Sequence, residues 1–409
     1  MTLSPSLQII APHLPEHHEA ISDLSAKVFG FDGAGNYFGI RQFLSAGYFA
    51  GSHYDPATSR IGLIDGQVVS HFGVWAYDMR VGAATVRCGG VGAVLTHPHF
   101  RKRGHLVKTA HASIDAMREA GHDLSSLFGI NDYYDRLGYV RAFPSQQHRI
   151  QATDLPAEKP ASTIRKFKLV RREDTDALYN RTFADVTGTA VRPTFTRAGN
   201  IRGEGYRWVD GRDRLAGYVY IKHDSANRRL NCHEAVGDPT QVLRTLGQLA
   251  RKLRCDDVTF IDQPIQTPLM QRVRQSRCEI ITHINPNGGP MAQVLNLRTT
   301  LAKIANELHL RLRQSPMAKW TGTLHVDDGK EKAALHITAR KITVSSESSK
   351  QKTKHKIKTR GHAVALVFGT NTPESKMREA NMQTTGDAAA LAAALFPEQN
   401  PMLLPFDHF

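Results

Sequence analysis

The sequence predicts an α/β protein, with α+β character, in which two related mixed-sheet units precede a small α+β domain. The chain has 409 residues, which exceeds one ordinary domain. Its first segment alternates strand and helix patterns, and a fainter helix-then-strand pattern returns in the second segment. We expect the three parts at residues 1–152, 163–295 and 296–409, with a linker rich in Pro, Ala, Ser and Lys after the first.

The first segment contains the clearest local signals. A helical pattern covers Ala20–Val28, and Asp65-Gly66 then joins two apolar runs, which is a hairpin signal. A strand pattern over Thr85–Thr96 leads into an amphipathic helix that Gly121 ends. The apolar run Leu124–Phe128 predicts the next strand, and a further helix is expected to start close behind it.

The later segments are read from the same patterns. Val242, Leu246, Leu249 and Leu253 form one apolar helix face, and Val258–Ile261 predicts the strand that follows. The third segment is expected to begin with one helix, continue with hairpins and end with an alanine-rich helix, over Thr300–Arg313, Gly322–His325, Ala334–Thr338, Lys341–Ser345 and Asp387–Leu395.

Composition sets limits on location and chemistry. No stretch approaches the roughly 20 apolar residues of a membrane helix, and no secretory signal is visible, so we expect a cytoplasmic protein. The four cysteines form no CxxC pair, which disfavours a structural zinc site and a disulfide framework: Cys88, Cys232, Cys255 and Cys278. No metal is therefore expected.

The net charge of +15 allows polyanionic partners, because a basic surface attracts nucleic acid, anionic membranes or phosphorylated cofactors. The charge is most concentrated over Lys350–Lys358, where lysines alternate with other residues. Such alternation fits one exposed face of an edge strand. A solvated edge is favoured over a nucleic-acid patch, because no aromatic residues interleave with the lysines.

The most informative run is Gly92–Leu106, which predicts a phosphate cradle. A strand ends at Thr96 or His97, and Pro98 cannot extend a central ladder. A helix begins near Gly104, and its first amides have no intrahelical partners and carry the positive end of the helix dipole. That arrangement binds phosphate or pyrophosphate. Three cations stand beside it, namely Arg101, Lys102 and Arg103.

These residues resemble the acetyl-CoA motif of the GNAT N-acetyltransferase superfamily, which reads roughly V-x-P-x-x-R-x-x-G. The matching positions are Thr96, Pro98, Arg101 and Gly104. Thr96 replaces the usual aliphatic residue, and Leu106 stands where many members carry a second Gly or Ala.

Two GNAT-like units with a small α+β tail make the whole chain similar to the enhanced intracellular survival (Eis) family. That family has tandem GNAT regions and a sterol-carrier-protein-like domain. Tyr133–Tyr139 is similar to its Tyr-Gly-Arg-Phe-Gly-Tyr-Gly motif, and Phe406 with Phe409 to its Phe-x-x-Phe-like end. The resemblance implies a homohexamer and transfer of acetyl from acetyl-CoA to an amine, on an aminoglycoside-like small molecule or a lysine side chain.

The resemblance also assigns roles to residues. Tyr134 takes the place of the general acid that protonates the departing thiolate, and the α-carboxylate of Phe409 that of the general base. The cofactor would be held by Val94, Leu95, Thr96, Arg101, Lys102, Arg103, Gly104, His105, Leu106 and Val107. A helix start near Gly129 and Ile130 would line its acetyl end, although this chain has Gly129-Ile130-Asn131-Asp132 where the family often has Ser-Glu-Gly-Gly.

Three further expectations follow from the residues themselves. His71, His97 and His99 are rival bases, although a lone loop histidine is more often only solvated. The second unit has Val236–Gln241 at the cradle position, without Arg-x-x-Gly and with Asp238 repelling phosphate, so one cofactor site is predicted. The apolar chain end, 401–409, is expected to dock into a cleft, because exposure of its apolar side chains to water would be unfavourable.

One alternative function stays open at this point. A non-catalytic protein that binds lipid or nucleic acid could use the third domain and the basic run at 350–358.

Overall fold

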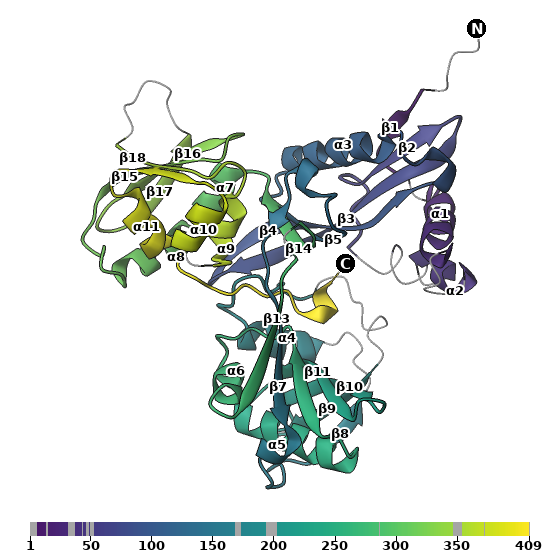
Figure 1. Ribbon diagram of the computed structural model, residues 1–409, viewed down its shortest axis with the longest axis vertical. Coiled ribbons are helices and arrows are strands. Elements are labelled where there is room, and N and C mark those ends of the chain that lie inside the picture. The colour runs from purple at the N-terminus through teal and green to yellow at the C-terminus, as the bar shows by residue number, and fades with distance from the viewer. Residues whose placement is uncertain are drawn as a thin grey trace.

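The computed structural model describes residues 6–13, 15–31, 37–42, 44, 45, 49, 53–167, 173–193, 203–285, 287–346, 354–371 and 373–408. Three β-sheets, each with its own helices, make up this part of the chain (Figure 1). The expected mixed α/β class is confirmed.

The first sheet has seven strands, in the order β1-β2-β3-β4-β5-β14-β6. A long hairpin of β3 and β4 lies at its centre. Asp65 and Gly66, where the sequence predicts a hairpin, join β2 to β3, and both have positive φ. The strands are β1 (Gln8–Ile10), β2 (Arg60–Ile64), β3 (Gln67–Val81), β4 (Ala84–Thr96), β5 (Leu124–Gly129), β14 (Gly289–Val294) and β6 (Val140–Arg141).

Two helices cover opposite faces of this sheet. Ser70 of β3 hydrogen bonds to Thr109 of α3 (His105–Glu119), with 2.7 Å between the two hydroxyl oxygens. The next residue, His71, packs instead on Phe49, which also contacts His18 of α1 (His18–Phe31). Since neighbouring strand residues point to opposite faces, α3 and α1 lie on the two sides of β3 (Figure 1). The short helix α2 (Tyr37–Gln42) packs beside α1.

The second sheet also has seven strands, in the order β13-β7-β12-β11-β10-β9-β8. These strands are β13 (Cys278–His283), β7 (Ser145–Gln151), β12 (Asp257–Ile261), β11 (Arg229–Val236), β10 (Leu215–Asp224), β9 (Glu204–Val209) and β8 (Arg165–Phe167). The apolar face expected around Val242 forms α5 (Pro239–Lys252), which packs on β10, β11 and β12. Helices α4 (Glu173–Thr182) and α6 (Pro268–Val273) complete this unit, and the 3₁₀ turn η4 (Ala152–Asp154) leads out of β7.

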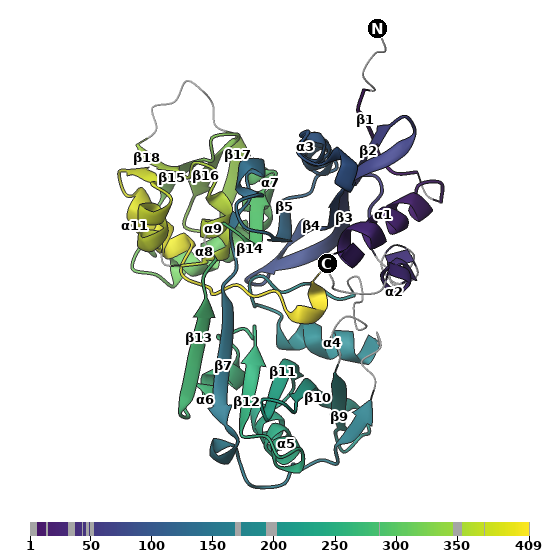
Figure 2. The same cartoon turned by 45° about the vertical axis from the view of Figure 1, so that its right-hand side comes forward.

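The two units exchange strands. β7 precedes the linker in the sequence, yet it lies between β12 and β13 of the second sheet. In return β14, which follows the second unit, lies between β5 and β6 of the first sheet. The expected range 1–152 contains β7, which pairs in the second sheet, and the expected range 163–295 contains β14, which pairs in the first sheet. The strand pairing therefore differs from the expected ranges at both strands. Each sheet thus depends on a strand from the other half (Figure 2).

The third sheet has five strands in the order β17-β16-β15-β18-β19. They are β17 (Ile342–Ser346), β16 (Lys332–Ile337), β15 (Gly322–Asp327), β18 (His355–Lys358) and β19 (Gln383–Thr385). The helices of this part are α7 (Leu297–Lys303), α8 (Ala305–Arg313), α9 (Ala363–Phe368), α10 (Pro373–Glu379) and α11 (Ala388–Leu395). The single helix expected over Thr300–Arg313 is therefore wrong in its bounds, because the chain breaks at Ile304 into α7 and α8.

The expected edge position of the basic run is also wrong. β18 is an inner strand that pairs with β15 on one side and β19 on the other. Ile357 is buried, and Lys356 binds Asp327 with 3.0 Å between the ammonium nitrogen and the carboxylate. This pairing could not be predicted from the sequence, because β18 pairs in parallel with β15, a strand that is distant in the sequence. Residues 350–353 of the run lie outside the described residues.

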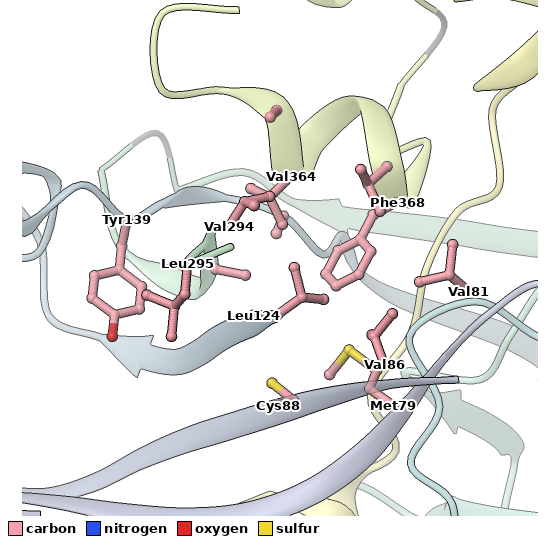
Figure 3. Packing of buried hydrophobic residues seen from close by; sticks show 14 of the residues in the cluster. Met79, Val81, Val86, Cys88, Leu124, Tyr139, Val294, Leu295, Val364 and Phe368 are labelled. Atoms are coloured by element: carbon pink, nitrogen blue, oxygen red, sulfur yellow. The ribbon is translucent and has the colours of Figure 1, made fainter. Parts of the chain in front are cut away.

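One hydrophobic core joins the first sheet to the third part of the chain. Val364 and Phe368 of α9 point toward Leu124 of β5 and Val86 of β4 (Figure 3). All four side chains are at most 1% exposed. The third part therefore packs on the first unit as a continuation of its core.

Candidate active site

β4 and β5 form a fork at the centre of the first sheet. They pair in parallel from Cys88 and Leu124 as far as Val91 and Leu127, and no further. β5 continues along β14 to Gly129, while β4 continues along β3 to Thr96. The two strands therefore separate at their carboxyl ends, and this place is called the fork below.

A bulge in β4 marks the beginning of the fork. The register with β3 changes between His71 and Gly73, and Ala93 has a φ of 46°. Beyond the bulge the His97 amide donates to the Val69 carbonyl of β3. Backbone groups alternate along a strand, so Leu95 also faces β3, whereas Val94 and Thr96 direct their amide and carbonyl groups into the fork. These are the strand residues expected to meet the cofactor's amides.

The helix that follows begins without a side-chain cap. Gly104 is the N-cap of α3 with a φ of 74°, it provides no side chain, and the first turn contains no acidic residue. The first helical bond is donated by Lys108 to the Gly104 carbonyl. In the described part of the chain, the amides of His105, Leu106 and Val107 have no acceptor, and a Cβ added to Gly104 would meet no atom within 4 Å. These amides can bind an anion such as pyrophosphate.

Cations surround this helix start. Arg101, Lys102 and Arg103 are all exposed, and the Arg103 guanidinium lies 5.5 Å from the centre of the Phe100 ring. Phe100 ends the 3₁₀ turn η2 (Pro98–Phe100), which redirects the chain after Thr96. Partial burial and then the charges of Arg103 and Lys108 lower the pKa of His105. The excess positive charge favours a polyphosphate ligand here.

The other arm of the fork ends in a turn, so the helix start expected near Gly129 and Ile130 is wrong. β5 ends at Gly129, and Asp132 has a φ of 58°, which interrupts a helical path. Only the 3₁₀ turn η3 (Asp135–Leu137) follows. Ile130 is 69% exposed, whereas a Cβ on Gly129 would lie 2.7 Å from Cδ2 of Tyr134.

Tyr134 therefore packs directly against the end of β5. Its side chain is 7% exposed, and burial raises the pKa of its phenol above the ordinary value. Its ring also contacts the rings of Tyr133 and Tyr139. Among the described residues no hydrogen-bond partner of its hydroxyl is found, so the group is available to a ligand.

The rival base His71 has a different task. Its Nδ1 lies 2.7 Å from the Ala93 carbonyl oxygen in the bulge, and its Nε2 lies 2.9 Å from the Tyr54 hydroxyl. Since a carbonyl only accepts, Nδ1 carries the proton and Nε2 accepts from Tyr54. Burial lowers the pKa of His71 to about 4, so the ring is neutral. This supporting role could not be predicted from the sequence, because one buried histidine forms no spacing pattern.

The second unit repeats the fork, but closes it. β11 and β12 pair as far as Cys232 and Phe260, and β11 has a register shift that leaves out His233. The side-chain amide nitrogen of Gln263 donates to the backbone carbonyls of His233 (2.8 Å) and Ile261 (3.0 Å), which bridges the two strands.

The helix start of the second unit is closed as well. Asp238 caps α5 by accepting from the Gln241 amide at 2.9 Å. A carboxylate thus occupies the position that is open at Gly104 in the first unit. This geometry supports the prediction that the first fork alone holds a cofactor.

The chain end docks between the two units, as its composition predicts (Figures 1 and 2). Leu404 is fully buried, and Phe406 packs edge-on against Tyr220 with 4.6 Å between the ring centres. Phe406 belongs to the 3₁₀ turn η5 (Pro405–Asp407). After this turn, the centre of the His408 ring lies 4.0 Å from the centre of the Phe128 ring, near the end of β5. Phe409, the expected general base, lies outside the described residues.

Comparisons with known proteins agree with this geometry. Residues 14–142, which contain the fork and the cradle, match the family model described as an acetyltransferase (GNAT) domain. A search of curated proteins finds no match. The fold is similar to that of a GCN5-related N-acetyltransferase from Anabaena variabilis, with 15% identity, a TM-score of 0.77, and 97% of this chain and 99% of that chain covered.

Two further structures are similar over their whole length. A GCN5-related N-acetyltransferase from Kribbella flavida has 17% identity and a TM-score of 0.71, covering 98% of this chain and 100% of its own. Eis1 from Mycobacterium abscessus has 16% identity and a TM-score of 0.66, covering 96% and 97%. At these identities the structural matches show the fold, and the domain match over residues 14–142 supports acetyltransferase activity. The protein is an acyltransferase with an acetyltransferase domain of the GNAT type.

In the described part of the chain, no helix is both long and apolar enough to cross a bilayer.

Proposed function

We propose that the protein is an Eis-type N-acetyltransferase that transfers acetyl from acetyl-CoA to a primary amine. One observation carries the proposal most: the open fork of β4 and β5 leads directly into the uncapped start of α3. Backbone groups of Val94 and Thr96 would hold the pantetheine amides and polarise the thioester carbonyl. The amides of residues 104–107, with Arg101, Lys102 and Arg103, would hold the pyrophosphate.

Acetyl-CoA supplies an already activated thioester, so the protein has little covalent chemistry to perform. A neutral amine attacks the carbonyl carbon, the C–N bond forms and the C–S bond breaks. Tyr134 donates its phenolic proton to the departing sulfur. The α-carboxylate of Phe409 accepts the proton that the amine nitrogen loses, directly or through a water.

The surroundings support these two roles. Burial raises the pKa of Tyr134, so the phenol keeps its proton until the thiolate develops. An α-carboxylate has an ordinary pKa of about 3.5, and burial would raise it toward that of a useful base. Docking of residues 402–408 beside Phe128 would bring the chain end to the fork.

The acceptor is proposed to be an aminoglycoside-like amine or a lysine side chain, as the Eis resemblance implies. The same resemblance underlies our proposals that the third domain is of the sterol-carrier-protein type and that the protein assembles as a hexamer.

Thiol release from acetyl-CoA, measured spectrophotometrically with a panel of primary amines, tests the proposal. The panel should include kanamycin and a lysine-containing peptide, and calorimetry should measure acetyl-CoA binding separately. We expect turnover with at least one amine and binding of acetyl-CoA without any acceptor. Binding without turnover would exclude the panel's acceptor classes, and the absence of both would overturn the proposed activity.

A further inference from the structure

A buried ionic cluster lies directly before the chain end. Arg192 binds the Glu234 carboxylate of β11 through Nη1 at 2.9 Å and Nη2 at 2.6 Å. It binds the Asp407 carboxylate of η5 through Nε and Nη2, both at 3.0 Å. These bonds use four of the five guanidinium N–H groups, so Arg192 joins two carboxylates that are far apart in the sequence.

Two tyrosines complete the cluster. Tyr179 of α4 donates to Asp407 at 2.9 Å, and Tyr218 of β10 donates to Glu234 at 2.6 Å. The Arg192 guanidinium also lies 3.6 Å from the centre of the Tyr179 ring, in cation–π contact. The cluster therefore anchors Asp407 to three parts of the second unit: a helix, the sheet and the loop of Arg192.

The cluster is almost completely removed from solvent. The side chains of Arg192, Glu234 and Asp407 are 8%, 0% and 1% exposed. Burial by itself lowers the pKa of Arg192, but Asp407 and Glu234 outweigh it and raise that pKa above its ordinary value. Buried ion pairs are an expensive way to gain stability, because desolvation offsets most of their attraction. Their geometric specificity is the more useful property.

That specificity is found where a chain end would ordinarily fray. Asp407 is held from the second unit, and the ring of the next residue, His408, packs at a tilt against Phe128 at the fork of the first unit. Phe406 on the other side of Asp407 packs on Tyr220. The segment thus bridges the second unit and the cofactor site, and the ion pair of Asp407 with Arg192 anchors it to the second unit.

We propose that Arg192 and Asp407 are positioning residues, which hold the last residues of the chain at the fork so that the terminal carboxylate reaches the acceptor amine. This inference rests on the proposed function of the Phe409 carboxylate. It gives the second unit, whose own fork is closed, a direct part in the reaction of the first. Neither residue touches the reacting atoms in this scheme.

A double-mutant cycle tests the inference. The variants are Asp407→Asn, the chain extended by one glycine after Phe409, and the two changes combined. We expect Asp407→Asn to lower kcat by about tenfold or more with KM for acetyl-CoA within about twofold, because misplacement by 1 Å can cost about 10²-fold. The extension should lower kcat by itself, and Asp407→Asn should add little in the extended chain.

Asp328→Asn is the matched control. Asp328 is also a buried carboxylate, and it accepts from the Gly361 and Ala363 amides at 3.1 Å in the third part of the chain. It has no contact with residues 401–408 among its described bonds. We expect this variant to lose thermal stability without a comparable loss of kcat, which separates general destabilisation from misplacement of the chain end.

Hydrogen–deuterium exchange gives a readout that does not require turnover. The peptide 400–409 should exchange faster in Asp407→Asn than in the wild type, while peptides of α3 and β4 stay unchanged. If Asp407→Asn does not fold, Tyr179→Phe replaces it, because that change removes one bond to Asp407 and keeps the ring beneath Arg192.

The possible results separate the inference from the function on which it rests. If the extension leaves kcat unchanged, the general-base assignment of Phe409 fails. If the extension lowers kcat but a folded Asp407→Asn or Tyr179→Phe does not, the positioning inference fails alone. Additive losses in the combined variant, or an unchanged exchange rate in the C-terminal peptide, would also overturn it.

Discussion

Among single residues, Tyr134 and His71 both lie close to the fork, but they differ in what their surroundings allow. Tyr134 has a protonated phenol and a hydroxyl without a partner in the described part of the chain. His71 has both ring nitrogens engaged, by Ala93 and Tyr54. The tyrosine is therefore suited to proton transfer, and the histidine to holding the bulge of β4.

Tyr134→Phe is expected to lower kcat by about 10²-fold or more, because it removes the proposed proton donor for the leaving sulfur. KM for acetyl-CoA should change by less than about threefold, since the ring that packs on Gly129 remains. Steady-state kinetics with the best acceptor amine measure both quantities. Tyr133→Phe is the control, because Tyr133 is the half-buried neighbour, and an equal loss in both variants would refute the role of Tyr134.

His71 should make stability depend on pH. Its folded pKa of about 4 lies below the ordinary value of 6.5, so the unfolded chain binds more protons between these values. The contribution is fully present above pH 6.5 and is lost as the pH falls toward 4, by about 3 kcal/mol. His71→Gln should therefore show a shallower fall of unfolding free energy over this range.

Urea unfolding at several pH values between 4.5 and 7.5 checks this expectation. His148 and His233, whose pKa values burial also lowers to about 4, keep part of the acid sensitivity in every variant. His99→Gln, at an exposed position, provides the control and should keep the wild-type slope. Equal slopes for His71→Gln and the wild type would mean that His71 does not resist protonation in the folded protein.

Among the elements, α3 and α5 form a natural pair of helix starts, one open at Gly104 and one capped by Asp238. Gly104→Asp should weaken acetyl-CoA binding by about 10²-fold, because a carboxylate would stand beside the pyrophosphate. Gly104→Asn is the matched neutral variant, since both residues tolerate positive φ better than other side chains do. Calorimetric titration of acetyl-CoA measures the two affinities, and equal affinities would contradict an anion site at this helix start.

How well each element could be predicted depends on how local its cause is. The hairpin at Asp65-Gly66 and the helix before Gly121 were predictable, because turn chemistry and helical spacing act within a few residues. The helix expected after Gly129 failed because left-handed Asp132 interrupts it, and such a conformation leaves no periodic signal. The residues of Gly92–Leu106 located the cradle and the resemblance named its cofactor, but neither could show that Val94 and Thr96 face the fork, which follows from the pairing with β3.

At the scale of the whole molecule, the sequence could not predict how distant segments come together. β7 pairs with β12 and β13, and β14 pairs with β5 and β6, and no pattern within either strand indicates these partners. Arg192, Glu234 and Asp407 were missed for the same reason, since three charged residues spread over the chain form no motif until the fold joins them. The exchanged strands connect the second unit to the first sheet, and the cluster connects it to residues 401–408.

The strand exchange makes a prediction about fragments. A cut near residue 160, in the exposed linker, leaves β7 in the first fragment and β14 in the second. Expressed alone, residues 1–160 would leave β5 and β6 without the strand between them, and β7 without its sheet. Unpaired strand edges and an open core favour aggregation, so we expect neither 1–160 nor 161–409 to fold by itself.

Co-expression of the two fragments should instead give a folded complex, because each supplies the inner strand that the other lacks. An affinity tag on residues 1–160 should retain residues 161–409 in about equal amounts, and the complex should unfold in a single transition. Since β5 of the fork regains its partner strand β14 in the complex, the purified complex should also bind acetyl-CoA. A monomeric, cooperatively folded 1–160 fragment would show that β14 is dispensable to the first sheet, and that the two units are joined more loosely than their shared strands imply.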